Sequence, residues 1–235
     1  MESKILMKNF LKLLLALFLL PLALFVVAEV FGACWHVFVD FQNAVGFLAG
    51  AALYCVIHFS VYKFERMYVF AHETTHAVAA MLFGFRVHDM SVNKDSGHVK
   101  MDRCNAAVVL APYFVPFYSI IVGLIYVGIG LFWPVENYSG AFIFLVGFFM
   151  AFHWVQTCKT LWETQQPDLK MAGGNLFSIV MIVLGNMIVL ALVLKCLFPQ
   201  RVELLEIARG ACNSTYNLWK IVINYIIDRA ISAQG

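Results

Sequence analysis

Residues 67–85 read MYVFAHETTHAVAAMLFGF, and Glu73 is the only formally charged residue in this stretch. It lies within the segment HETTH at 72–76, which has the form HExxH. Residues i and i+4 lie on one face of a helix, so both imidazoles of the segment can reach the same metal ion. Two imidazoles and a carboxylate are costly inside an apolar helix without a compensating partner. The stretch therefore predicts a helix that carries a metal site.

The rest of the chain has the composition of a membrane protein. Of its 235 residues 62% are hydrophobic and 13% are charged, whereas about a quarter of the residues of a soluble domain are charged. The net charge of +2 leaves no basic excess for a phosphate backbone, so no nucleic-acid partner is expected. Runs without charge occupy 13–28, 41–62, 104–135, 137–158 and 171–194.

These runs are long enough, or nearly so, to cross the hydrocarbon of a bilayer as helices. The expected fold class is an all-α polytopic membrane protein with about five to six transmembrane or re-entrant helices. The lipid bilayer itself is then the first partner of the chain.

No linker or repeat divides the sequence, so a single integral membrane domain over 1–235 is expected. Residues 1–62 would form N-terminal helices, 63–198 the core that holds HETTH, and 199–235 a C-terminal amphipathic segment. Apolar residues recur at helical spacing over 218–226 in that last segment. This face either lies in the membrane interface or docks on the helix bundle.

A polar stretch over 85–103 follows the HETTH segment. Its residues alternate in polarity around Asp95-Ser96-Gly97, and this pattern predicts a short β-hairpin between helices. Such a hairpin has an edge strand, with which a substrate segment that has unwound from a helix could pair.

Glu73 follows the first histidine by one position, so it adjoins the face that would bind the metal. There it can act as a general base that takes a proton from a metal-bound water molecule. If that water hydrolyses an amide, the same carboxyl can later donate a proton to the amine that leaves. Histidine and carboxylate ligands with an open coordination position are typical of catalytic zinc. Zn²⁺ is therefore the expected cofactor, and the ligand types leave other divalent metals open.

A catalytic zinc site needs a third protein ligand, and Asp168 is the best candidate. Pro167 would end one helix and leave this carboxylate on an irregular segment that can turn toward the site. The alternative is a solvated Asp168 balanced by Lys170. Glu163 and His153 are the other candidate ligands. The remaining histidines have no chelating neighbour and are not expected to bind metal: His36, His58, His88 and His98.

These features resemble the site-2 protease family of intramembrane zinc metalloproteases, and the likeness covers roughly residues 65–195. It rests on HETTH within an apolar helix, on the segment LFGFRV at 82–87 that leads into a Gly97-containing hairpin, and on Pro167-Asp168 before the last core helix. The family usually has glycine directly after its ligand aspartate, where this chain has Leu169.

The resemblance implies that His72, His76 and Asp168 bind zinc and that Glu73 activates water. It also implies a hairpin that helps to present the substrate. The expected function is that of an intramembrane zinc metalloendopeptidase acting on a peptide bond of a membrane-embedded or membrane-adjacent protein. From their place in the sequence, Gln165 or Gln166 is a candidate to stabilise the oxyanion.

The alternative function is a metal-binding membrane transporter or scaffold without proteolytic activity. A carrier lines its path with polar groups from several helices, whereas 104–135 and 171–194 contain no charge. For the topology, Lys4, Lys8 and Lys12 precede a segment over 29–43 that has no Lys or Arg. This asymmetry predicts a cytoplasmic N-terminus.

Overall fold

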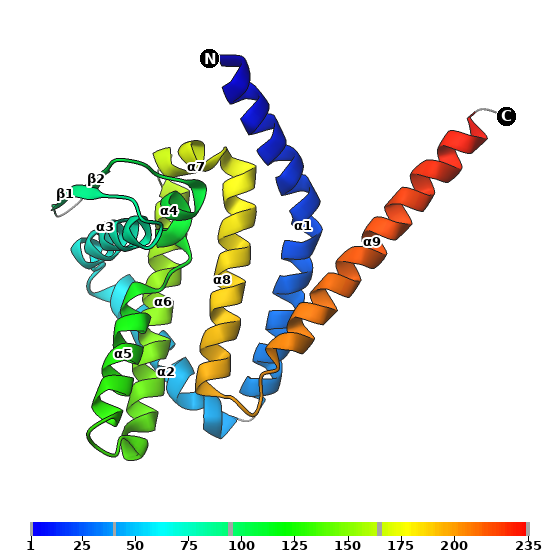
Figure 1. Ribbon diagram of the computed structural model, residues 1–235. Coiled ribbons are helices and arrows are strands. Elements are labelled where there is room, and N and C mark those ends of the chain that lie inside the picture. The colour runs from blue at the N-terminus through cyan, green and yellow to red at the C-terminus, as the bar shows by residue number, and fades with distance from the viewer. Residues whose placement is uncertain (1, 40, 94–95, 164–165, 234–235) are drawn as a thin grey trace. The chain divides into compact units, whose positions relative to one another are not determined.

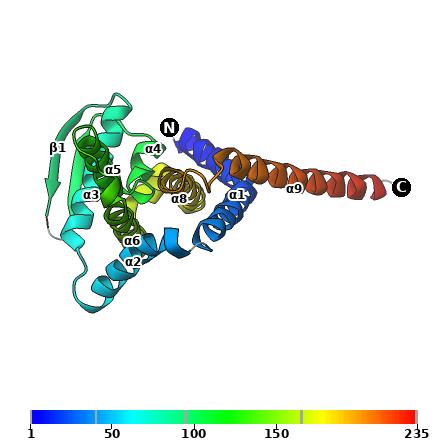
Figure 2. The same ribbon diagram turned by 90° about the horizontal axis from the view of Figure 1, so that it is seen from below.

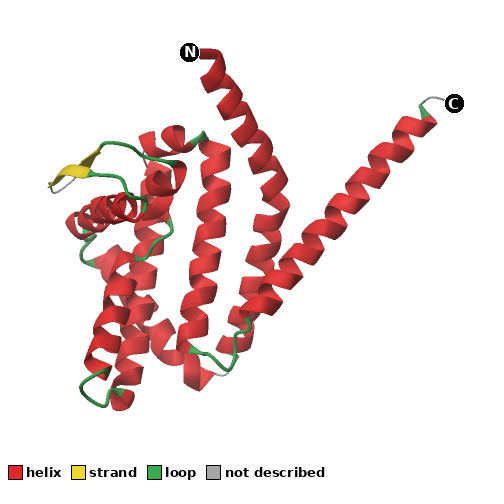
Figure 3. Ribbon diagram, viewed as in Figure 1, coloured by secondary structure: helices red, strands yellow, loops and turns green. Residues whose placement is uncertain are grey.

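The computed structural model describes residues 2–39, 41–93, 96–163 and 166–233, which form helices apart from one hairpin and the connecting loops (Figure 3). The chain divides into two compact units, one of residues 1–39 with 179–235 and the other of residues 40–178. The sequence did not predict this grouping of the two chain ends. The single-domain assignment stays a prediction.

The unit made by the chain ends contains α1 (Glu2–Phe38), nearly all of α8 (Asn175–Leu197), and α9 (Leu204–Ser232). Helices α1 and α9 contact each other, and the ring of Phe18 stacks on that of Trp219 with 5.4 Å between centroids. Most of the apolar face over 218–226 is nevertheless exposed, with Ile221 at 67%, Tyr225 at 60% and Ile226 at 59%. Which of the two expected placements this face takes stays a prediction.

In the second unit, α2 (Phe41–Ser60) packs along α6 (Ser139–Glu163). Two glycines allow the helices to approach closely, because a Cβ at Gly50 would overlap the carbonyl oxygen of Phe144 and one at Gly147 would overlap that of Phe47. Farther along the same two helices, the buried ring of Tyr54 packs edge to face against the rings of Phe148 and Phe152. This helix pair is the main packing contact of the unit.

Helix α3 (Glu65–Leu82) carries HETTH and is followed by the antiparallel strands β1 (Val87–Val92) and β2 (Gly97–Met101). Both strands pack against α3, so the hairpin covers one side of that helix (Figures 1 and 2). The predicted hairpin over 85–103 is confirmed.

The charge-free run at 104–135 is not one continuous helix, which corrects the expectation of a simple span there. It forms α4 (Ala106–Leu110), the 3-10 helix η1 (Ala111–Tyr113) and α5 (Phe117–Gly130), and the chain bends by 80° between the first two and α5. The physical cause is proline, because Pro112 and Pro116 each lack an amide hydrogen and clash with the preceding turn. The second 3-10 helix, η2 (Glu136–Tyr138), leads into α6.

Three helical segments of the described chain are long and apolar enough to cross a membrane: Asn9–Phe38, Ser139–Trp162 and Asn175–Leu197. The bent pair in 106–130 makes a fourth if it counts as one span, and the apolar part of α2 is shorter. Helix α3 is not among these spans. The predicted fold class, an all-α membrane protein with a hairpin after the HETTH helix, is confirmed.

The close contact between α2 and α6 leads to a first prediction. Gly147→Val should lower the free energy of unfolding by about 1–3 kcal/mol, because the added side chain overlaps the backbone at Phe47. Gly140→Val is the matched control, since nothing lies near a Cβ at that position of the same helix. Thermal unfolding in detergent would compare the two variants with wild type, and equal midpoints for both would contradict the packing argument.

Candidate metal centre

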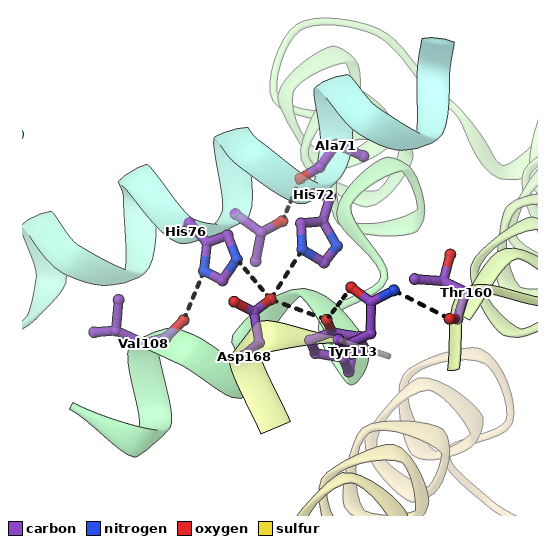
Figure 4. A network of polar contacts seen from close by, with 9 residues as sticks. Ala71, His72, His76, Val108, Tyr113, Thr160 and Asp168 are labelled. Atoms are coloured by element: carbon purple, nitrogen blue, oxygen red, sulfur yellow. Dashed lines mark hydrogen bonds and ion pairs between the residues drawn. The ribbon is translucent and has the colours of Figure 1, made fainter. Parts of the chain in front are cut away.

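Three predicted ligands meet at one point of the second unit (Figure 4). Nε2 of His72 and Nε2 of His76, both on α3, each lie 3.5 Å from Oδ2 of Asp168. The three ligand atoms are all within 4.8 Å of one another, and no other such group of His, Cys, Asp or Glu occurs among the described residues. This group could hold a metal ion.

The distances suit a metal better than direct hydrogen bonds. A hydrogen bond between nitrogen and oxygen spans about 2.7–3.2 Å, so 3.5 Å is long for one. Ligand atoms placed tetrahedrally at about 2.0–2.1 Å from a zinc ion are separated from one another by about 3.4 Å. The two nitrogen-to-oxygen distances therefore match two edges of a tetrahedral site.

The imidazole of His76 is oriented by the backbone of α4. Its Nδ1 lies 3.0 Å from the carbonyl oxygen of Val108, which can only accept, so Nδ1 carries the proton. Nε2 then has a free lone pair that faces Asp168, as a metal ligand requires. The ring of His72 instead packs edge to face against Tyr113, with centroids 5.2 Å apart, and its buried Nδ1 has no hydrogen-bond partner in the described structure.

Asp168 is held by a tyrosine that the sequence analysis missed. The hydroxyl of Tyr113, a fully buried residue of η1, donates to Oδ2 of Asp168 at 2.9 Å. The same hydroxyl lies 3.3 Å from Oε1 of Gln166, whose amide nitrogen donates to the carbonyl oxygen of Thr160. This chain of contacts fixes the carboxylate relative to α6. The only signal for it in the sequence was Pro112, which precedes the tyrosine.

The charge state of Asp168 follows from these contacts. Burial alone would raise the pKa of its carboxyl, but the contacts with His72, His76 and Tyr113 hold that pKa well below its usual range. The group is therefore ionised at neutral pH, as a metal ligand has to be.

The surroundings of Asp168 differ from the expectation in one respect. It lies in the first turn of a short helix, α7 (Pro167–Ala172), and not on an irregular segment. Pro167 is tolerated at the first helical position because its missing N–H would have no intrahelical partner there. The side chain of Asp168 is only 22% exposed and contacts the two histidines, so it is not the solvated loop residue of the alternative interpretation.

The other candidates lie elsewhere or cannot be placed. His153 is buried in α6 and does not belong to the group of three. The side chain of Glu163 and the whole of Gln165 lie outside the described residues. The histidines that were not expected to bind metal are also outside the group: His36, His58, His88 and His98.

Glu73 lies beside the group of three and not within it. Its side chain is buried, with 8% exposure, and it packs on the backbone at the start of β2, where a Cβ at Gly97 would overlap it. Burial raises the pKa of the Glu73 carboxyl, and the neighbouring imidazoles of His72 and His76 offset part of this rise. A carboxylate with a raised pKa is a stronger base.

Two cavities of the second unit reach both Glu73 and His72. One of about 360 Å³ also contains His76 and Asp168 and is bounded by the hairpin, α4 and α7. The other, of about 540 Å³, has several polar side chains in its wall: Glu65, Tyr68, Gln156, Lys159, Thr160 and Gln166. The candidate metal centre therefore borders two spaces, each large enough to hold several atoms of a ligand or several water molecules.

Comparison of the chain with protein-family models, curated proteins and solved structures finds no significant match. Its function is therefore inferred from the geometry of the site.

The hydrogen bond from Tyr113 leads to a second prediction. Tyr113→Phe should weaken metal binding about 10- to 100-fold, the usual effect of losing a partner that orients a ligand. The affinity would be measured by titrating metal-free protein with zinc in the presence of a competing chelator. Tyr126→Phe is the control, because its hydroxyl donates to the carbonyl of Val135 instead. Equal zinc affinities in the two variants would show that Tyr113 does not orient Asp168.

Proposed function

We propose that the protein is an intramembrane zinc metalloendopeptidase that hydrolyses a peptide bond of a membrane-embedded or membrane-adjacent protein. One observation carries the proposal: a buried carboxylate, Glu73, stands next to a group of two histidines and an aspartate without belonging to it. A site that only stores or carries a metal needs ligands, and it has no need for such a neighbouring base. The resemblance of HETTH and Pro167-Asp168 to the site-2 protease family supports the same assignment.

The ligands in this proposal are His72, His76 and Asp168. A divalent metal held by them supplies Lewis acidity, which lowers the pKa of water and polarises the scissile carbonyl. Glu73 takes one proton from the attacking water as the water oxygen bonds to the carbonyl carbon. The carbon–nitrogen bond then breaks, and Glu73 gives this proton to the leaving nitrogen. Gln166, which borders both cavities, is the proposed donor to the oxyanion; its amide nitrogen donates one hydrogen to the carbonyl oxygen of Thr160, and the second hydrogen would serve this role.

The substrate in this proposal is a peptide segment that has left its helical form. A helix within hydrocarbon hides its amides in internal hydrogen bonds, so cleavage needs local unwinding and access for water. The strands β1 and β2 form a sheet of only two strands, and an extended segment can pair with an edge strand of such a sheet. The polar wall of the 540 Å³ cavity supports a route for water toward Glu73.

We also propose a multi-pass topology with a cytoplasmic N-terminus. Lys4, Lys8 and Lys12 begin the chain, and Lys63 and Arg66 flank the start of α3. Cytoplasmic segments near membrane spans carry an excess of lysine and arginine. In this topology, the N-terminus of the chain and the first turn of α3 both lie on the cytoplasmic side of the membrane.

The ligand assignment gives a third prediction. Purified protein should contain about one zinc ion per chain, because the site offers three ligands and an open position. The double variant His72→Ala, His76→Ala should lose it, while a variant at a remote histidine, His36→Ala, should keep it. The zinc content of each variant would be measured by inductively coupled plasma mass spectrometry. Stoichiometric zinc in the double variant would remove the basis of the assignment.

The role of Glu73 gives a fourth prediction, which separates a peptidase from a transporter or scaffold. Glu73→Gln keeps the size of the side chain and the metal ligands but cannot accept a proton. It should retain zinc while turnover falls about 10²- to 10⁴-fold, the usual loss for a general base. Glu206→Gln, in the first turn of α9, is the control.

The assay is co-expression with candidate single-span membrane proteins, followed by comparison of the membrane proteomes. A precursor should accumulate with Glu73→Gln and be cleaved by wild type and by Glu206→Gln. Altered metal flux in Glu73→Gln, with no precursor accumulating, would favour the transporter.

A further inference from the structure

A third cavity of the second unit, of about 670 Å³, lies between the end of α2 and the end of α6. It contains neither a predicted metal ligand nor Glu73, so the proposed chemistry does not use it. Its wall consists of aromatic, apolar and basic side chains: His58, Phe59, Lys63, Trp154, Val155, Cys158, Lys159 and Trp162.

The aromatic side chains place this cavity at a membrane boundary. Ser139–Trp162 is a candidate span, and Trp162, at its end, is 92% exposed. Phe59, near the end of α2, is 76% exposed. Tryptophan is enriched where hydrocarbon meets the polar headgroups, because its ring is apolar and its N–H needs a polar partner. The cavity therefore has an apolar wall at the level where lipid headgroups begin.

The formal charges in the wall of this cavity are both positive. Lys63 is exposed, and its backbone carbonyl accepts a hydrogen bond from Gln156, which fixes the chain at this point. Lys159 donates to Oε1 of Glu65 at 2.8 Å, and it borders the 540 Å³ cavity as well. No carboxylate lines the 670 Å³ cavity in the part of the chain that the structure describes.

We propose that this cavity binds an anionic phospholipid. The phosphate of the headgroup pairs with the ammonium groups of Lys63 and Lys159, and an acyl chain lies against Phe59, Trp154 and Trp162. A lysine is a common partner of phosphate, and basic pockets between membrane helices bind acidic headgroups. The proposal does not depend on the peptidase assignment.

Glu65 gives the proposal a consequence with a definite sign. This carboxylate competes with the phosphate for Lys159 and repels it. Removing the charge of Glu65 should therefore tighten lipid binding, whereas removing the charge of Lys63 should weaken it. Opposite effects of two neutralising substitutions are not expected from unspecific adsorption to a hydrophobic surface.

The test is the thermal midpoint of the full chain in a neutral detergent, titrated with phosphatidylglycerol or with phosphatidylcholine of the same acyl chains. A ligand that binds the folded state raises the midpoint. Phosphatidylglycerol should raise it, while phosphatidylcholine and inorganic phosphate at equal concentration should not. The apparent affinity for phosphatidylglycerol should fall about fivefold in Lys63→Gln and rise by a similar factor in Glu65→Gln. Lys100→Gln, on β2, should leave it unchanged.

Lys63→Arg keeps the charge and should keep the affinity, so it separates loss of binding from loss of fold. Equal stabilisation by both lipids would overturn the proposal, because charge would play no part. An equal effect of inorganic phosphate would also overturn it in favour of a site for free anions. The same affinity in Lys63→Gln, Glu65→Gln and Lys100→Gln would place any bound lipid elsewhere on the protein.

Discussion

The carboxylate of Asp168 is the point on which the arrangement of the site depends. It contacts the two imidazoles of α3 and accepts a hydrogen bond from Tyr113, so one side chain joins α3, α7 and the bend after α4. Such a partly buried charge is tolerated only when its partners compensate for the lost water. Because the carboxylate and its partners come from three separate segments, the folding of each depends on the placement of the others.

The sequence was informative where a pattern is local. HETTH predicted one helix face, and the alternation around Gly97 predicted the hairpin, because both signals lie within a few residues of the chain. Asp168 was found by its type and position, although the short helix around it was not predicted. Tyr113 could not be found in this way, since it meets Asp168 across 55 residues of sequence. The run at 104–135 was interpreted as one span from its lack of charge alone, and this criterion does not detect the bend near Pro112 and Pro116.

The distribution of polar side chains around α3 is compatible with the proposed hydrolysis in an otherwise apolar chain. Polar side chains gather in the cavities that reach Glu73, whereas the contact between α2 and α6 is built from glycine and aromatic residues. The ion pair of Lys159 with Glu65 lies between the 540 Å³ cavity and the aromatic 670 Å³ cavity, since Lys159 lines both. A single lysine therefore belongs to two environments, and its partner on one side affects what it can bind on the other.

The contact between Gly97 and Glu73 limits how this protein can change. Even a methyl group at position 97 would overlap the side chain of Glu73, so the strand or Glu73 would have to shift to accommodate it. The exposed positions of the hairpin, such as His98 and Lys100, meet no such restriction. In the proposed peptidase, the exposed neighbours can change to suit different substrates, whereas a larger residue at position 97 would displace Glu73 or the strand. The hairpin thus combines one sterically restricted position with an unrestricted surface.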